Sequence, residues 1–206
     1  MLLHLIRHGQ TSWNAEQRIQ GRMESELDDT GRQQAIERGA ALQSIEFDAV
    51  YSSSSIRARQ TTELILNGSR LQIHYRDNLR EMSLGEWEGQ LWPDVLRKDP
   101  EAVARFRAAE DEFSAPGAET FSELQARGVA AIESVIAETG EGEILVVSHG
   151  AILKRILAKY SHTKLSKCSE LPSLPNCSHC IIQANGASRQ VVQIDNLPIA
   201  ETPWAS

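Results

Sequence analysis

Two short segments of the chain are almost continuously apolar. Residues 2–6 read Leu-Leu-His-Leu-Ile, and residues 144–147 read Ile-Leu-Val-Val. A strand of a parallel sheet is covered on both faces, so its sequence is a nearly unbroken apolar run rather than an alternation of apolar and polar positions. Both segments are therefore predicted to be central parallel strands. Residues 47–51 and 71–75 predict two further strands.

Amphipathic segments separate these strands. Asp28 or Thr30 is suited to cap the first helix, and the polar run 52–55 is suited to precede the second. In the longest pattern, which begins near Glu119, apolar side chains recur at helical spacing. The sequence thus predicts helices over 28–44, 56–66, 119–138 and 151–160, with helical pieces over 93–113 that stop before Pro116-Gly117.

The alternation of strands and helices predicts an α/β fold. The expected architecture is a three-layer sandwich, with a mainly parallel central sheet and helices on both faces. Residues 180–184 and 190–194 look like a terminal hairpin, which leaves open an antiparallel edge, and Pro198 and Pro203 mark a tail. Polar stretches at 10–27 and 78–89 are predicted loops. The length of 206 residues suits one domain spanning 1–206.

Charge and hydropathy narrow the possible partners. The formal net charge is -7 and the sequence pI is near 5.4, which argues against a broad surface for nucleic acid or anionic membrane. We expect neither partner, so an anionic ligand would need a local positive field. The N-terminal apolar run is too short for a secretory signal, and no segment approaches a membrane span. A cytoplasmic location is the expectation that follows.

Three cysteines lie late in the chain, at Cys168, Cys177 and Cys180. Their odd number does not suit a disulfide framework. With His179 they raise the alternative of a zinc site, but no second Cys-x-x-Cys pair completes a tetrahedral ligand set. The favoured interpretation is that Cys180 is a buried strand residue, and no metal is expected.

The two most apolar strands end in similar tripeptides, Arg7-His8-Gly9 and Ser148-His149-Gly150. Open α/β sheets bind their ligands beyond the carboxyl ends of the strands. Neighbouring parallel strands would bring the two histidines together there, beside an arginine. The sequence therefore predicts a phosphate-handling site.

Five pieces of the chain, in this order, resemble the motifs of the histidine phosphatase superfamily, also called the phosphoglycerate-mutase-like family. The resemblance implies that fold, no cofactor, and His8 as nucleophile, with Arg7, Arg57 and His149 holding phosphoryl oxygens. It also implies Glu81 as proton donor and Asn14, Gln20 and Gly21 near the phosphate. The pieces are RHGQTSWN at 7–14, QG at 20–21, SSSSIRARQT at 52–61, LREMSLGEWEG at 79–89 and SHG at 148–150.

Physical chemistry supports these roles. Arginine binds phosphate oxygens two at a time, and nearby guanidinium groups should lower the pKa of His8, which must be unprotonated to attack. Helix N-termini after His149 and near 52–55 are expected to point further N–H groups at the anion. Glu81 would protonate the leaving oxygen and then accept a proton from water.

Hydrolysis of small phosphomonoesters is the favoured reaction. Mutases of the family that the chain resembles usually have a longer section between the acid and the second histidine, with further basic residues. Here the stretch between Glu81 and His149 is shorter and its middle at 110–112 is acidic, so the resemblance favours a phosphatase. Phosphoglycerate mutase activity is the first alternative, and a phospho-ligand binding module without turnover is the second. A dinucleotide-binding domain would need a glycine-rich turn that the chain lacks. The sequence leaves monomer or homodimer open.

Overall fold

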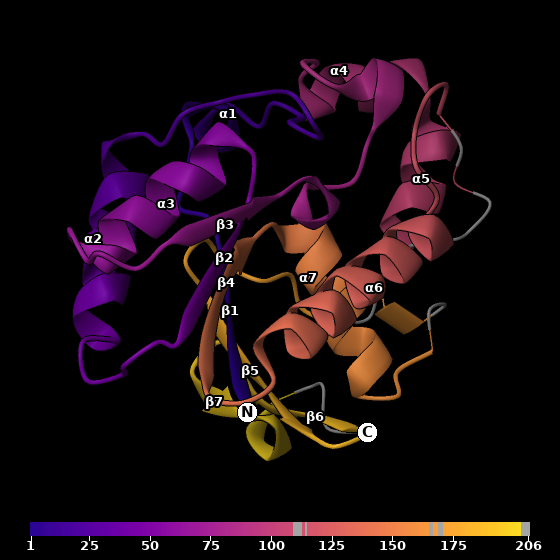
Figure 1. The fold of residues 1–206 in the computed structure, drawn as a ribbon. Helices are drawn as coiled ribbons and strands as arrows, with labels where there is room; N and C mark the ends of the chain where they lie inside the picture. Colours follow the sequence, from indigo (N-terminus) through magenta and orange to yellow (C-terminus); the bar gives the residue numbers. More distant parts are fainter. Residues whose placement is uncertain (109–112, 114, 165–166, 169–170, 203–206) are drawn as a thin grey trace.

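A single sheet runs through the middle of the molecule (Figure 1). The computed structural model describes residues 1–108, 113, 115–164, 167–168 and 171–202. In this part of the chain the strand order is β3-β2-β4-β1-β5-β6-β7. The strands are β1 (Leu2–Arg7), β2 (Ala49–Ser53), β3 (Ile73–Arg76), β4 (Glu143–Ser148), β5 (His179–Asn185), β6 (Ser188–Ile194) and β7 (Leu197–Pro198).

The first four strands pair in parallel, and the last three add an antiparallel edge. Helices connect the parallel strands, because the crossover between two parallel strands needs about a dozen residues or more and is usually an α-helix. The α-helices are α1 (Ser12–Ala15), α2 (Asp29–Ala41), α3 (Ile56–Leu66), α4 (Trp92–Lys98), α5 (Pro100–Ala108), α6 (Phe121–Thr139) and α7 (Gly150–Tyr160), with 3-10 turns η1 (Asp77–Leu79), η2 (Gly85–Trp87) and η4 (Ile199–Glu201).

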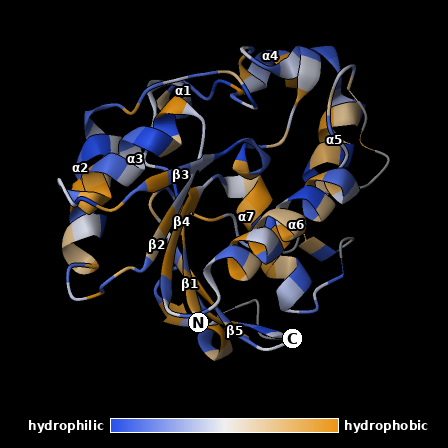
Figure 2. Ribbon diagram, in the orientation of Figure 1, coloured by the Kyte–Doolittle hydropathy of each residue, from blue (hydrophilic) through white to orange (hydrophobic). Residues whose placement is uncertain are grey.

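Helices cover both faces of the sheet, which confirms the predicted three-layer α/β architecture. Helices α2 and α3 lie on one face and α6 and α7 on the other (Figure 1). On β4, Leu145 and Val147 pack toward the first pair, while Ile144 and Val146 pack toward the second. The central strands therefore bury apolar side chains on both faces of the sheet, and much of their ribbon has the hydrophobic colour in Figure 2. This is the physical reason for their unbroken apolar sequences.

The register of β1 and β4 places the two predicted histidines side by side. Arg7 pairs with Ser148, the last residue of β4. His8 and His149 are therefore each the first residue beyond neighbouring strand ends, and the backbone N–H of His8 donates to the carbonyl of Ser148 at 2.9 Å. The prediction that the histidines of the two tripeptides meet beyond neighbouring parallel strands is confirmed.

Helix α2 packs closely against the turn that follows β1. Asp28, rather than Thr30, caps the helix by accepting the N–H of Gly31 at 2.7 Å. A Cβ at Gly31 would lie only 1.9 Å from the backbone carbonyl oxygen of Gln10. Glycine is required there because any side chain would displace the turn that carries His8.

Several predicted boundaries differ from the structure. Strand β2 starts two residues later than predicted, at Ala49, and Asp48 just before it accepts the N–H of Glu143 through its carboxylate at 2.8 Å. The predicted loop 10–27 contains the single-turn helix α1, which Thr11 and Asn14 close with a capping box. The predicted tail includes β7. Residues 109–112 and Pro203, which also carried predictions, lie outside the described residues.

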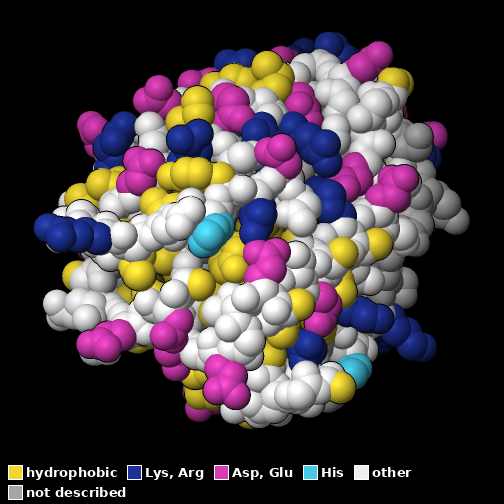
Figure 3. Space-filling view, viewed as in Figure 1, with side chains coloured by type: hydrophobic (Ala, Val, Ile, Leu, Met, Phe, Trp, Pro, Cys, Tyr) yellow, Lys and Arg dark blue, Asp and Glu magenta, His cyan; other side chains and the backbone are white. Residues whose placement is uncertain are grey.

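The late cysteines are buried, free thiols. Cys180 is a residue of β5 and is 1% exposed, as its strand interpretation requires. Among the described residues no three His, Cys, Asp or Glu side chains are grouped so that they could hold a metal ion. Nor does any helix of the described residues have the length and apolarity to cross a bilayer. Acidic and basic side chains are interspersed on the face shown in Figure 3.

Candidate active site

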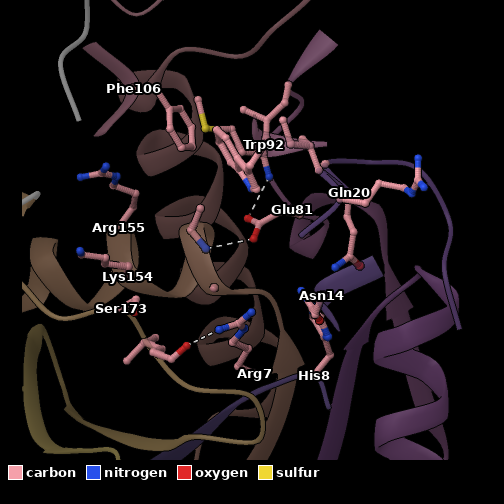
Figure 4. A pocket seen from close by; sticks show the side chains of 18 of the residues that line it. Arg7, His8, Asn14, Gln20, Glu81, Trp92, Phe106, Lys154, Arg155 and Ser173 are labelled. Carbon is pink, nitrogen blue, oxygen red and sulfur yellow. Dashed lines mark hydrogen bonds between the residues drawn. The ribbon is translucent and has the colours of Figure 1, made fainter. Parts of the chain in front are cut away.

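A cavity of about 410 Å³ opens beyond the carboxyl ends of β1 and β4. It brings together side chains from the loops after β1 and β3 and from helices α3 and α7 (Figure 4). Seven of the eight residues selected from the sequence line it: Arg7, His8, Asn14, Gln20, Gly21, Arg57 and Glu81. The eighth, His149, is fully buried and lies behind His8.

The imidazole of His8 is 4% exposed and has a defined tautomer. Its Nδ1 lies 2.7 Å from the carbonyl oxygen of Gly9. Because a carbonyl only accepts, Nδ1 carries the hydrogen and Nε2 keeps its lone pair. The pKa of His8 is well below its ordinary value, chiefly through burial and then through the charges of Arg57 and Arg7. The arginine effect expected from the sequence is present but second to desolvation.

His149 lies against His8, with ring centroids 5.1 Å apart. Its Nε2 is 2.8 Å from the hydroxyl oxygen of Ser53 and 3.2 Å from that of Ser55. Its Nδ1 accepts from Nε of Arg57 at 3.2 Å. Burial, followed by the charge of Arg57, lowers the pKa of His149 well below its ordinary value. A neutral imidazole thus fits between a cation and two hydroxyl groups.

Two buried guanidinium groups supply positive charge at the base of the cavity. Arg57 is held by the carbonyl oxygens of Gly21 and Met23, at 2.8 and 2.9 Å, besides its bond to His149. Burial lowers its pKa to about 10, so it remains a cation at neutral pH. Arg7 donates from NH1 to the carbonyl of Leu174, and its buried Nε has no hydrogen-bond partner among the described residues.

Glu81 enters the cavity opposite these cations. Its Oε2 accepts the N–H of Ala151 at 3.0 Å, and its Oε1 accepts those of Ile152 and Met82 at 3.1 and 3.0 Å (Figure 4). The first two N–H groups belong to the opening turn of α7, which leaves such donors unpaired within the helix. The carboxylate is therefore fixed at the helix N-terminus that follows His149.

The expectation that helix N-termini point at the anion is wrong for the donors seen here. Glu81 takes up the N–H groups of Ala151 and Ile152. At α3, the carboxylate of Glu24 accepts the N–H of Ile56 at 2.8 Å and pairs with Arg80. At both helix N-termini an acidic side chain accepts the N–H groups that an anionic ligand would otherwise bind.

Asn14 and Gln20 line the cavity, and local hydrogen bonds orient their side-chain amides. Asn14 Oδ1 accepts the N–H of Thr11 at 3.1 Å, which orients the amide from α1. Gln20 Oε1 accepts from the hydroxyl of Ser25 at 2.7 Å. In both cases the oxygen is occupied, so the amide nitrogen is the group left to face an anion.

The outer half of the cavity was not predicted. Met82, Trp92, Phe106 and Phe121, none of which is among the predicted site residues, line it, and Met82 and Phe121 also belong to the buried core. Trp87 belongs to the core and does not line the cavity. Among the lining residues that the structure describes, Glu81 is the one acid and the cations outnumber it. The unpredicted cations are Arg18, Arg107, Lys154 and Arg155. Their helical and loop positions gave no motif signal.

Comparison with known proteins places this cavity in context. A metal-independent phosphoserine phosphatase of Arabidopsis thaliana is 34% identical over 178 residues, covering 84% of this chain and 72% of that one. A probable phosphoglycerate mutase, GpmB, of Salmonella choleraesuis is 32% identical over 151 residues, covering 73% and 70%. Such relatives indicate phosphatase activity or mutase-like character.

Solved structures agree. YhfR of Bacillus stearothermophilus superposes with a TM-score of 0.91 at 33% identity, covering 95% of this chain and 96% of that one. The α-ribazole phosphatase of Shigella flexneri gives 0.85 at 25% identity with the same coverage. The family model described as histidine phosphatase superfamily, branch 1, matches residues 3–197. The chain belongs to the histidine phosphatase superfamily.

Proposed function

We propose that this protein hydrolyses small phosphomonoesters through a phosphohistidine intermediate and without a metal ion. The observation that carries the proposal is the meeting of two neutral imidazoles, two buried guanidinium groups and one carboxylate at a single cavity. A phosphomonoester carries about -1.5 to -2 charges near neutral pH, which matches the local excess of cations. The single domain over 1–206 remains a prediction.

In the first step Nε2 of His8 attacks phosphorus and the ester P–O bond breaks. Arg7 and Arg57 hold the phosphoryl oxygens and neutralise their charge, and His149 supports them from behind His8. Asn14 Nδ2, Gln20 Nε2 and the backbone at Gly21 add polar contacts. Glu81 gives its proton to the leaving oxygen, so that an alcohol departs rather than an alkoxide.

In the second step water attacks the phosphorus of phosphohistidine. The carboxylate of Glu81, now deprotonated, takes a proton from this water, and the P–N bond breaks to release inorganic phosphate. His8 returns to its neutral form and Glu81 to its acid form. Each group therefore ends the cycle as it began.

The first test uses His8→Ala with p-nitrophenyl phosphate in EDTA. We expect wild type to release phosphate in the chelator and His8→Ala to fall by roughly 10⁴-fold or more, because the nucleophile is gone. Acid-labile, base-stable label on wild type after brief exposure to ³²P-substrate is the companion measurement. Equal release by both proteins would favour the binding module, and loss in EDTA would require a metal.

Mutase activity is the second candidate function, favoured by the similarity of the chain to the probable phosphoglycerate mutase of Salmonella choleraesuis. The two reactions differ only in whether water or a second hydroxyl accepts the phosphoryl group. Kinetics with 3-phosphoglycerate, with and without a bisphosphoglycerate primer, separate them. We expect phosphate release to exceed isomerisation, and the reverse ratio would assign the mutase.

A further inference from the structure

The backbone that carries Glu81 is irregular. Residues 80–83 follow the 3-10 turn η1 and belong to neither a strand nor an α-helix. Carbonyl groups in such a segment have no ladder or helical partners, so their donors must come from elsewhere in the molecule. The position of the Glu81 carboxylate depends on which groups supply them.

One side chain from helix α6 donates to two carbonyl groups of this segment and to one carbonyl group of η1. Arg127 NH1 donates to the carbonyl oxygens of Asn78 at 2.9 Å and Arg80 at 2.8 Å. Its NH2 donates to the carbonyl of Glu81 itself at 3.3 Å. Arg127 is not a lining residue of the cavity. It therefore contacts the candidate proton donor only through the backbone.

Arg127 is itself held in place by a two-point ion pair. Its Nε and NH2 each lie 2.8 Å from one carboxylate oxygen of Glu119. Glu119 in turn donates its N–H to the carbonyl of Ser83 at 2.8 Å and accepts the N–H of Ser83 at 3.3 Å. The Arg127–Glu119 pair thus binds the segment that contains Glu81 at both ends, at Arg80 and at Ser83. Bidentate pairs of this kind fix geometry as well as charge.

Helices α6 and α7 together hold Glu81, one at its backbone and the other at its carboxylate. Its carboxylate is bound to the first turn of α7, and its backbone is bound to α6 through Arg127. At Gly128, next to Arg127, an added Cβ would lie 2.9 Å from Ile152 and Ile156 of α7. The two helices that hold Glu81 are therefore closely packed against each other at this point.

We propose that Arg127 is a positioning residue that holds Glu81 where it can protonate the leaving oxygen. The proposal rests on the hydrolase mechanism given above. An acid displaced by about 1 Å can cost roughly 100-fold in rate, even when the change lies outside the reacting groups. The loss should depend on the leaving group, because a weakly basic phenolate departs without help and an alkoxide does not.

The experiment compares kcat/KM for glycerol 2-phosphate and p-nitrophenyl phosphate, expressed as the ratio of alkyl to aryl substrate. Glu81→Gln should lower this ratio by roughly 100-fold or more. Arg127→Gln should lower it in the same direction by roughly 10-fold to 100-fold. In the double variant the ratio should fall no further than in Glu81→Gln alone, because Arg127 acts through Glu81.

Arg189→Gln is the matched control. Arg189 forms a similar two-point pair with Glu133 of α6, at 3.0 and 2.8 Å, but away from the cavity. It should leave the ratio unchanged even if the thermal midpoint falls. An Arg127→Gln variant that slows both substrates equally would overturn the proposal. Where this variant does not fold, Arg127→Lys decides: a lowered ratio supports the proposal, and a wild-type ratio overturns it.

The outcomes also separate the two proposals. If Glu81→Gln leaves the ratio unchanged, the assignment of Glu81 as proton donor fails, and the positioning role of Arg127 fails with it. If Glu81→Gln lowers the ratio and Arg127→Gln does not, only the inference about Arg127 is overturned.

Discussion

His8 combines burial with two neighbouring cations, and each has a different consequence. Burial disfavours any charge on the ring and makes the largest contribution to its low pKa. The charges of Arg57 and Arg7 lower the pKa further, and both side chains line the cavity. In the proposed mechanism the same two side chains therefore bind the anionic substrate and keep His8 neutral.

Arg57→Gln tests this coupling. Removing the charge raises the pKa of His8, and since His8 must be neutral to attack, the acid limb of kcat/KM should move to higher pH. Activity at the optimum should also fall by roughly 10-fold to 100-fold through the lost charged hydrogen bonds. The measurement is a pH profile with p-nitrophenyl phosphate, whose own ionisation is common to both proteins.

The same substitution at Arg59 is the control for that profile. Arg59 is exposed two residues further along α3 and stacks over the ring of Tyr75 at 4.3 Å. Arg59→Gln should leave the acid limb in place. An unmoved limb in Arg57→Gln would show that its charge does not set the protonation of His8.

At the level of elements, the position of His8 depends on how α2 packs against the turn after β1. The carbonyl oxygen of Gln10 occupies the space that a Cβ at Gly31 would need. Gly31→Ala should therefore lower the free energy of unfolding by about 1–3 kcal/mol through overpacking and reduce kcat/KM by moving residues 9–10. Denaturant melts and p-nitrophenyl phosphate kinetics measure both.

Thr30→Ala provides the comparison in the same turn of α2. Thr30 is exposed, so its loss should change stability by no more than about 0.5 kcal/mol and leave kcat/KM unchanged. If Gly31→Ala behaves like Thr30→Ala, the close approach of α2 to the turn is not a constraint on the site.

How far the sequence predicts such elements depends on the signal each one carries. His8 and His149 follow apolar strands and stand beside glycines, so both their element and their meeting point could be predicted. Arg127 carries no such signal, since its role depends on which face of α6 meets an irregular loop. Trp87 and Trp92 are the same residue type five positions apart, yet one is core and the other lines the cavity. Only the packed fold separates them.

For the whole molecule, the contrast is between an acidic chain and a basic cavity. The net charge is -7, yet one carboxylate and six cations line the cavity among the described residues. Acidic side chains elsewhere, such as Glu24 at α3, cap helices and pair with surface arginines. The cavity thus has a local excess of cations that attracts a small anion, while the net negative charge of the chain disfavours nonspecific binding of polyanions.

Buried neutral histidines also link the stability of the whole fold to pH. Burial lowers the pKa of His179 to about 3, and the pKa values of His8 and His149 are lowered as well. Below pH 6.5 these histidines bind protons in the unfolded chain but not in the folded chain. The free energy of unfolding should therefore decrease as the pH is lowered, by up to about 1.4 kcal/mol per pH unit for each histidine.

Urea melts from pH 7.5 to 5.0, above the range where most carboxylates titrate, measure the slope of the free energy of unfolding against pH. His179→Gln should reduce this slope by roughly a third, because His8 and His149 still titrate. Ile182→Val on the same strand removes a methyl group and no titrating group, so it should lower stability equally at every pH. A slope that is unchanged in His179→Gln would mean that the protons do not enter at His179.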